Sequence, residues 1–291
     1  MKFLLTGATG YVGLRLSRTL ISMGHSVAAL SRNVSRLESS VQAFEYTGRV
    51  EDIDRAVSFC KPDAIVHVAA DVSKSSGTDS VESLLAANVV LPTQLICVAN
   101  KYKVGKFVNI STFSTSLNGR DYNPQTLYAA TKKACEDLLL YYHLSEDTAV
   151  CTLCFYDVYG PDQSHARFLN SAIESLSKGQ VFEMTKGEQD ICFLYVDDAV
   201  DSIVFAVNND RLFDKSSPQI YSVCGPEVFQ LRDVPSRIAA VAAISDPEVM
   251  FSKPYRRNEI MRFAPPHPKL PEWNPKFSFR DGIKEIISSN Y

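Results

Sequence analysis

A tyrosine and a lysine stand four residues apart in the stretch LYAATKK, as Tyr128 and Lys132. Residues four apart lie on one face of a helix, so a helix here would project the phenol and the ammonium group into the same space. A free phenol, with a pKa of about 10, is a poor acid–base catalyst at neutral pH. Because a nearby cation favours the phenolate and lowers that pKa, the pair has the chemistry to give a proton to a carbonyl oxygen or take one from an alcohol.

Two hydroxyl residues, Ser111 and Thr112, end an apolar run at 106–112 that predicts a strand. Parallel sheets place ligands at the carboxyl ends of their strands, so the Thr112 hydroxyl could hydrogen-bond the oxygen that Tyr128 protonates. The tyrosine–lysine spacing alone occurs by chance on many surface helices, and Thr112 alone could be a cap or loop hydroxyl. The prediction of a catalytic set therefore depends on Thr112, Tyr128 and Lys132 together.

The opening stretch TGATGYVG places Gly7, Gly10 and Gly13 between a predicted strand at 2–6 and a predicted helix at 11–24. In this setting the first glycine permits a tight turn, the second lets a pyrophosphate approach the backbone, and the third lets the helix pack on the strand. The free N–H groups of the helix start would face the phosphates. The pattern predicts a dinucleotide site, with a tight turn that binds no ligand as the alternative.

The end of the next predicted strand, at 26–31, should contact the ribose of a dinucleotide. An NAD site usually has an acid there, but this chain has Ser31 and Arg32, with no acid until Glu38. A guanidinium and a hydroxyl suit a 2′-phosphate, so NADP(H) is favoured and NAD(H) remains possible. Arg32 could instead be a solvated surface residue.

Short apolar runs alternate with helical patterns through the first half of the chain. The predicted strands are 2–6, 26–31, 43–47, 63–70, 106–112 and 149–156, and the predicted helices are 11–24, 52–60, 79–102 and 127–144. Strands alternating with crossover helices indicate an α/β fold with a parallel sheet covered on both faces. Pro92 falls inside the third helix and should kink or split it.

The pattern loosens after residue 156, where turns and prolines gather. We therefore expect a dinucleotide-binding domain at 1–156 and a smaller lobe over most of 157–291. The segment 194–209 resembles a strand followed by a helix. Residues 191–208 are accordingly expected to return to the first domain and its sheet.

Composition narrows the classes of function. The chain has 291 residues and a net charge of −3, with no basic block that would favour nucleic acid. No apolar run approaches the ~18 residues of a membrane span, and no signal peptide is recognisable, so a cytoplasmic protein with no membrane partner is expected. Seven cysteines, an odd number, show no zinc spacing beyond Cys151 and Cys154, which would point to opposite faces of a strand. The sequence thus predicts buried reduced thiols and no metal.

A resemblance to a known family joins these features. The glycine loop, His67-Val-Ala-Ala70, Asn88, Ser111-Thr112, Tyr128 with Lys132, Val158-Tyr-Gly-Pro161 and Tyr195-Val-Asp-Asp198 resemble, in the same order, the extended short-chain dehydrogenase/reductases of the NAD-dependent epimerase/dehydratase family. The resemblance covers about two thirds of the chain. It implies a Rossmann-type doubly wound parallel sheet with a smaller C-terminal substrate lobe that binds a nucleotide-diphosphate sugar.

The resemblance carries cofactor contacts onto Gly7, Gly10, Val68, Ala69, Asn88 and Lys132, and the arguments from individual residues add the rest of each site. The expected cofactor contacts are Gly7, Thr9, Gly10, Tyr11, Val12, Gly13, Ser31, Arg32, Val50, Val68, Ala69, Ala70, Asn88, Ile110 and Lys132, and the expected substrate contacts are Thr112, Phe113, Tyr128, Asp157, Arg167 and Arg262. Relatives commonly dimerise through the two helices that are here 79–102 and 127–144, so a homodimer is expected.

Within this family the chain looks most like the nucleotide-linked 4-keto-6-deoxyhexose reductases of the abequose and paratose synthase kind. Thr112 and Tyr128 are 16 residues apart, without the longer insert of most epimerases, and Pro92 replaces a common glycine. The stretches 186–189 and 257–261 are also similar. The Asp-Glu pair that dehydratases carry after the threonine is Phe113-Ser114 here, which argues against dehydration.

Two other functions stay open at this point. One is a nucleotide-sugar 4-epimerase, which would recycle tightly held NAD(P); the other is a non-catalytic dinucleotide-binding regulator. Arg32 favours a reductase that exchanges NADPH at each turnover, with Tyr128 as proton donor. The chain also departs from many sugar-modifying relatives, because Cys154 and Ile191 replace arginines and Arg49 replaces an acid.

Overall fold

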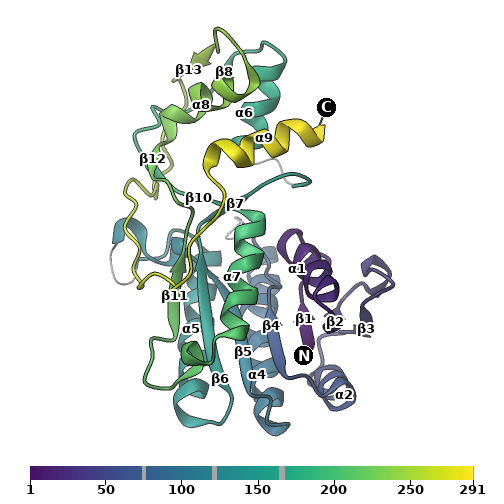
Figure 1. Ribbon diagram of the computed structural model, residues 1–291. Helices are drawn as coiled ribbons and strands as arrows, with labels where there is room; N and C mark the ends of the chain where they lie inside the picture. The colour runs from purple at the N-terminus through teal and green to yellow at the C-terminus, as the bar shows by residue number, and fades with distance from the viewer. Residues whose placement is uncertain (74–76, 120–122, 164–167, 291) are drawn as a thin grey trace.

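A seven-stranded sheet forms the centre of the larger part of the computed structural model (Figure 1), which describes residues 1–73, 77–119, 123–163 and 168–290. Its strands lie in the order β3 (Gln42–Glu45), β2 (Ser26–Ser31), β1 (Lys2–Thr6), β4 (Ala64–His67), β5 (Lys106–Thr112), β6 (Ala149–Phe155) and β11 (Ile220–Val223). All neighbouring pairs are parallel. This confirms the predicted doubly wound α/β fold.

Helices cover both faces of this sheet because its strands are apolar on both sides. Helices α1 (Tyr11–Ser22) and α7 (Val196–Asn208) pack with Leu5 and Val66 on one face. Helices α2 (Val50–Cys60), α4 (Leu91–Lys101) and α5 (Leu127–Ser145) pack with Leu4 and Ile65 on the other. Successive strand residues point to opposite faces. Each of these four buried side chains contributes about 1.5–3 kcal/mol of apolar burial.

The long helical stretch is continuous but locally widened. It consists of α3 (Thr78–Leu85), a π-helical turn (Ala86–Val90) and α4, which carries Pro92 in its first turn. Because the helical stretch runs on without a break, Pro92 lacks an N–H that an interior residue would donate to the preceding turn. The break expected at Pro92 is therefore a π turn just before it, and Asn88 lies buried in that turn.

The stretch Ser80–Lys101 is long and apolar enough to cross a membrane by length and composition, so the expectation that no run approaches that length is wrong. In the structure it is a layer helix: α4 lies against α2 and α5, and Leu84, Leu95 and Ile96 are buried. In the tested window, 39% is buried, and one such helix is weak evidence for a membrane span because core helices of soluble proteins pass the same test.

A smaller lobe lies beyond the carboxyl edge of the sheet (Figure 1). It contains α6 (Phe168–Ser177), α8 (Val234–Ala242) and α9 (Phe279–Asn290), with the short strand pairs β8 (Phe182–Glu183) with β13 (Val249–Met250) and β9 (Asp190–Ile191) with β12 (Phe229–Gln230). Short 3₁₀ turns occupy Val34–Arg36, Phe113–Thr115, Leu117–Gly119, Asp210–Phe213 and Leu231–Asp233.

The strand expected to return to the main sheet does not join it. Strand β10 (Phe193–Tyr195) pairs with β7 (Asp157–Tyr159) in a separate two-stranded ladder, while the following helix α7 lies against α1 and β5. The strand that extends the main sheet is β11, which pairs with β6. That strand was not predicted, and the division of the chain at residue 156 stays a prediction.

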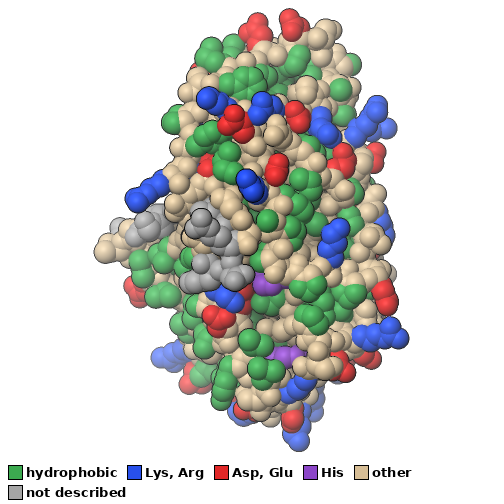
Figure 2. Space-filling model, turned by 90° about the vertical axis from the view of Figure 1, so that its left-hand side faces the viewer, with side chains coloured by type: hydrophobic (Ala, Val, Ile, Leu, Met, Phe, Trp, Pro, Cys, Tyr) green, Lys and Arg blue, Asp and Glu red, His purple; other side chains and the backbone are tan. Residues whose placement is uncertain are grey.

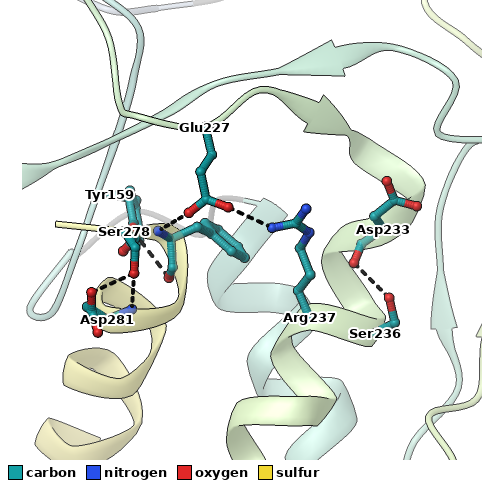
Figure 3. A network of polar contacts seen from close by, with 8 residues as sticks. Tyr159, Glu227, Asp233, Ser236, Arg237, Ser278 and Asp281 are labelled. Atoms are coloured by element: carbon teal, nitrogen blue, oxygen red, sulfur yellow. Dashed lines mark hydrogen bonds and ion pairs between the residues drawn. The ribbon is translucent and has the colours of Figure 1, made fainter. Parts of the chain in front are cut away.

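The last helix is fixed to the smaller lobe by a carboxylate (Figure 3). Glu227 accepts a hydrogen bond from the backbone N–H of Phe279, the first residue of α9, at 3.0 Å, and pairs with Arg237 of α8 at 3.0 Å. A negative charge is favourable at a helix N-terminus. Tyr159 packs beneath the same turn, where a Cβ on Gly282 would lie 2.1 Å from its hydroxyl. Helix α9 thus closes the lobe over β7.

The cysteines and surface charges complete the description. All seven cysteines are free; Cys135, Cys151, Cys154 and Cys192 are buried, as expected, whereas Cys60 and Cys224 are half-buried and Cys97 is exposed. The prediction of buried thiols is wrong for these last three. Lys and Arg side chains are interspersed with Asp and Glu on the face shown in Figure 2.

Candidate active site

The glycine loop between β1 and α1 is packed too closely for side chains. Gly7 has a φ of +74°, and a Cβ there would lie 2.6 Å from the backbone nitrogen of Ala69. A Cβ on Gly13 would lie 2.1 Å from the Gly7 carbonyl oxygen. Gly10 has an extended φ of −89° and donates its N–H to Gly7 at 2.9 Å. Gly7 and Gly13 therefore serve the packing of loop and helix, as the fingerprint predicts.

The start of α1 has the chemistry to bind an anion. Its N-cap is Gly10, and among the described residues no side chain caps this end and no acid stands in its first turn. Uncapped N–H groups at a helix start attract phosphate. Thr9 and Tyr11 flank Gly10, and Val12 is half-buried behind them. The glycine cradle and the uncapped helix start fit the pyrophosphate of a dinucleotide.

A buried threonine sets the neighbouring loop against the glycines. Thr6, at the end of β1, lies 2.8 Å from Nδ1 of His67 and accepts the N–H of Ala69 at 3.3 Å. Val68 and Ala69 thus border Gly7, while Ala70 is exposed. Burial, with the charge of Lys132 nearby, holds the pKa of His67 well below its usual value, so this imidazole is neutral.

Asn88 joins the same loop to α5. Its Oδ1 accepts the N–H of Asp71 at 2.9 Å, and its Nδ2 donates to the Asp71 carbonyl at 2.9 Å and to the Thr131 hydroxyl at 3.0 Å. An amide has two N–H donors, so both are used within the chain. The Asn88 side chain holds the site together, and its expected contact with the cofactor stays a prediction.

Tyr128 and Lys132 lie on one face of α5. Thr126 caps this helix by accepting the N–H of Ala129 at 3.1 Å, which places Tyr128 in the first turn. Tyr128 is half-buried, whereas Lys132 is only 1% exposed. Burial lowers the pKa of Lys132, and the neighbouring Cys135 and Glu136 oppose that shift. A buried ammonium group thus stands one helical turn from the phenol.

A buried carboxylate, Glu136, lies one helical turn beyond Lys132 on the same face of α5, and the sequence analysis missed it. Glu136 is 1% exposed, accepts a hydrogen bond from the Ser111 hydroxyl of β5, and lies 3.5 Å from the Lys133 ammonium. Burial raises the pKa of Glu136, while the hydrogen bond from Ser111 opposes that rise. The available signal was the spacing, because Tyr128, Lys132 and Glu136 recur every four residues. Glu136 supplies negative charge beside the buried lysine.

Thr112 ends β5 beside this row and caps the turn that follows. Its Oγ1 accepts the N–H of Ser114 at 3.3 Å and lies 3.0 Å from the Ser114 hydroxyl. Thr112 therefore does cap this turn, which is the alternative role that the sequence left open for it. If Ser114 donates in the hydroxyl pair, Thr112 keeps its own proton for a ligand.

Three aromatic rings form a wall next to Thr112. Phe113 stacks on Tyr156 with centroids 4.7 Å apart and planes at 13°, and Phe263 lies 5.0 Å from Tyr156. The segment carrying Phe263 is held by Asn118, whose Oδ1 accepts the N–H of Met261 at 2.7 Å and of Arg262 at 3.0 Å. An apolar surface thus lies where the substrate is expected.

The remaining predicted residues are spread around this centre. Ile110 packs on the α1–α7 side of the sheet, and Asp157 is half-buried at the start of β7, opposite Phe193 of β10. Val50 opens α2 and borders a groove between α2 and α4, away from Tyr128. Arg262 is exposed, and Arg167 lies outside the described residues.

Ser31 and Arg32 stand at the end of β2. The Ser31 hydroxyl bonds Asn33 at 3.1 Å, and Arg32 is exposed. The first acid after this strand, Glu38, pairs with Arg18 of α1 at 2.7 Å. Glu38 is therefore engaged away from Arg32, and the exposed cation at this strand end is Arg32.

Known proteins resemble this chain over nearly its whole length. The family model described as the NAD dependent epimerase/dehydratase family matches residues 3–224. The CDP-abequose synthase of Salmonella typhimurium is 27% identical over 304 aligned residues, which cover 98% of this chain and 96% of that protein. The UDP-glucose 4-epimerase of Mycolicibacterium smegmatis is 27% identical and covers 99% of this chain and 97% of its own length.

Among solved structures, the UDP-glucose 4-epimerase of Thermus thermophilus in complex with NAD is similar over 99% of this chain and 98% of its own, with a TM-score of 0.80 and 24% identity. The corresponding enzyme of Thermotoga maritima, with UDP-glucose, has a TM-score of 0.84 and 20% identity, covering 99% and 98%. These likenesses show a shared fold over nearly the whole chain.

Proposed function

Because this chain belongs to the NAD-dependent epimerase/dehydratase family and is an NAD(P)-dependent enzyme, we propose that it uses NADPH to reduce the C4 keto group of a nucleotide-linked 4-keto-6-deoxy sugar. The observation that carries this proposal is that Tyr128 and the buried Lys132 stand one turn apart on α5, which packs against the turn that follows Thr112. Full-length similarity to CDP-abequose synthases supports the substrate class.

The chemistry follows from these side chains. Bound NADPH supplies the hydride that adds to C4. Tyr128 gives its phenolic proton to the carbonyl oxygen, so that the ketone becomes an alcohol, and the Lys132 ammonium stabilises the phenolate left behind. At the ~5–6 Å typical of side chains one turn apart, this attraction amounts to about 3 kcal/mol at an effective dielectric constant of ~20. Thr112 donates to the same oxygen and orients it.

NADPH is preferred in this proposal because of Arg32. Its guanidinium is exposed at the end of β2, and Glu38 is already paired with Arg18. A guanidinium binds a phosphate by two parallel hydrogen bonds, which a ribose 2′-hydroxyl cannot match.

The aromatic wall favours a deoxy sugar. Phe113, half-buried and stacked on the buried ring of Tyr156, offers an apolar surface beside Thr112, with no carboxylate at position 113. A C6 methyl group can bury against such rings, whereas a C6 hydroxyl or carboxylate would lose its water there. This arrangement supports reduction over dehydration, which needs an acid and a base at that place.

A homodimer is part of the proposal. The outer face of α5 exposes Tyr141 by 61% and Leu144 by 63%, and Val90 next to α4 is also exposed. Large apolar side chains that stand exposed on a layer helix support an interaction surface there. The helices α4 and α5 of two copies would cover each other there.

The experiment that tests the function is an NADPH-oxidation screen. Purified protein is mixed with NADPH and with CDP-, GDP-, dTDP- or UDP-linked 4-keto-6-deoxy sugars. The proposal expects stoichiometric oxidation with one of these substrates and a new alcohol at C4. A protein that carries bound NAD and interconverts C4 epimers without added reductant would instead be an epimerase.

A further inference from the structure

Two cysteines that are 32 positions apart in sequence lie in contact behind the aromatic wall. Cys192 lies between β9 and β10, and Cys224 directly follows β11. The Cys192 thiol lies against the Cys224 sulfur and donates its hydrogen bond to the Gly225 carbonyl oxygen at 3.5 Å. The two chain segments touch, because a Cβ on Gly225 would lie 1.9 Å from the Phe193 oxygen. The thiols are thus held together by the backbone packing around them.

The two thiols have different surroundings. Cys192 is buried and Cys224 is half-buried. The neighbouring Cys192 thiol, helped by the charge of Lys269, lowers the pKa of Cys224, while the Cys224 sulfur and burial raise the pKa of Cys192. A half-buried thiol with a lowered pKa beside a buried second thiol with a raised pKa is the arrangement of a reactive and a resolving cysteine. By contrast, burial raises the pKa of Cys60 and of Cys135 to about 11.

We propose that Cys192 and Cys224 form a redox site that a hydroperoxide converts to a disulfide. The Cys224 thiolate attacks one peroxide oxygen, the O–O bond breaks, and a sulfenic acid and hydroxide result. The Cys192 sulfur then attacks the sulfenic sulfur, an S–S bond forms, and the S–O bond breaks. The Cys192 proton leaves with the hydroxyl as water. In sum, two thiols and one H₂O₂ give one disulfide and two waters, and an external dithiol reverses the change.

The site lies behind the proposed substrate wall. Tyr156 donates its N–H at 3.2 Å to the carbonyl of Val223, the residue before Cys224, and its ring stacks on Phe113. On the other side, Cys192 precedes Phe193, which pairs with Asp157. A disulfide would therefore join the segment beside Tyr156 to the strand beside Asp157. The glycine loop, at the end of β1, is not part of either segment.

The first test requires no substrate and is independent of the proposed function. The full-length protein is treated with equimolar H₂O₂, alkylated, digested without reduction and analysed by mass spectrometry. We expect a loss of two hydrogen atoms and a cross-linked peptide pair containing Cys192 and Cys224, which dithiothreitol separates. Cys224→Ser and Cys192→Ala should each abolish the cross-link. Cys97→Ser, which changes an exposed cysteine on α4, should leave it intact.

Two outcomes would overturn the site. One is a cross-link that persists in Cys224→Ser; the other is wild-type Cys224 stopping at sulfinic acid while Cys192 stays alkylatable after unfolding. Circular dichroism and thermal melts establish that each variant is folded, and Cys224→Ser, at a half-buried position, is the variant on which the test depends if Cys192→Ala does not fold.

The second test rests on the proposed reductase activity. We expect the disulfide to raise KM for the keto sugar by roughly threefold to tenfold, since displacements below ~1 Å suffice for such losses, and to leave the Kd for NADPH unchanged. Dithiothreitol should restore the wild type, and peroxide should not change Cys224→Ser. If the disulfide forms and KM for the keto sugar does not change, the disulfide does not regulate the substrate site.

Discussion

Three glycine substitutions separate the packing role of the glycine loop from its role in binding. In Gly13→Ala the new Cβ would lie 2.1 Å from the Gly7 carbonyl oxygen, well inside the 3.4 Å at which ordinary contact begins. The atoms nearest to this Cβ, the Gly7 carbonyl group and the Ala8 Cα, belong to the backbone, so α1 must move by more than about 1 Å. Overpacking of this kind costs about 3 kcal/mol. At about 2.1 cal/mol/K of unfolding entropy per residue, that loss corresponds to a fall in melting temperature of roughly 5 °C for this 291-residue chain.

Gly10→Ala should behave differently. Its Cβ would lie 3.2 Å from the Gly7 oxygen, with no other described atom within 4 Å, and its φ of −89° suits alanine. Because the Gly7 carbonyl needs to shift by only a few tenths of an ångström, we expect a much smaller fall in melting temperature than for Gly13→Ala. The methyl group would occupy the approach of the pyrophosphate, so the Kd for NADPH should rise at least about tenfold, or about 1.4 kcal/mol.

The control is Gly105→Ala, because a Cβ there meets nothing within 4 Å. It should change neither property. Scanning fluorimetry gives the melting temperatures, and titration of NADPH fluorescence gives the Kd. If Gly10→Ala binds NADPH as tightly as the wild type does, the phosphates do not lie over this loop, and the cofactor site has been placed wrongly.

Three further predictions concern single residues. Arg32→Ala should raise KM for NADPH about tenfold to 100-fold, the equivalent of ~1.5–3 kcal/mol of charged hydrogen bonds, and leave KM for NADH unchanged in steady-state assays; an equal change for both cofactors would remove the argument for a 2′-phosphate. Burial holds the pKa of Glu136 above its usual value, so the charged carboxylate costs the folded protein stability above that pKa and the cost disappears as the pH falls through it. Glu136→Gln should accordingly melt higher than the wild type at pH 8 and lose this advantage towards pH 5, and a constant difference across that range would contradict the buried charge. Leu144→Asp should convert a dimer to a monomer, as measured by light scattering. Phe59→Ser, which changes an equally exposed residue on α2, should leave the dimer intact. If both variants are monomeric, the change in mass does not locate the interface at α5, and this part of the proposal fails.

The sequence predicted the parallel sheet well because its strands are continuous apolar runs. The bounds 2–6, 26–31 and 106–112 agree with β1, β2 and β5. Strand β11 was missed because Ile220–Val223 is a short run inside a polar, proline-rich stretch. The segment at β10 was identified as a strand, but its partner was not. Residue pattern predicts burial, and it does not say which edge a short strand will pair with.

The site was predicted where the chemistry is local. Tyr128 and Lys132 share a helix face by spacing alone, and Gly7 and Gly13 occupy the positions that the fingerprint requires. The Cys192–Cys224 contact could not be predicted, because it depends on how the segments around β10 and β11 meet. The same holds for Asn88, whose amide reaches Asp71 and Thr131 from a π turn.

The most direct measurement for the central claim is the turnover of Tyr128→Phe. Phenylalanine keeps the ring and removes the proton that the proposed reduction requires, so NADPH should bind with an unchanged Kd. We expect kcat for the keto sugar to fall by about 10²–10⁴-fold, the range of general acid catalysis. A variant that reduces the sugar within about threefold of the wild-type rate would show that another group supplies the proton, and the assignment of Tyr128 would be wrong.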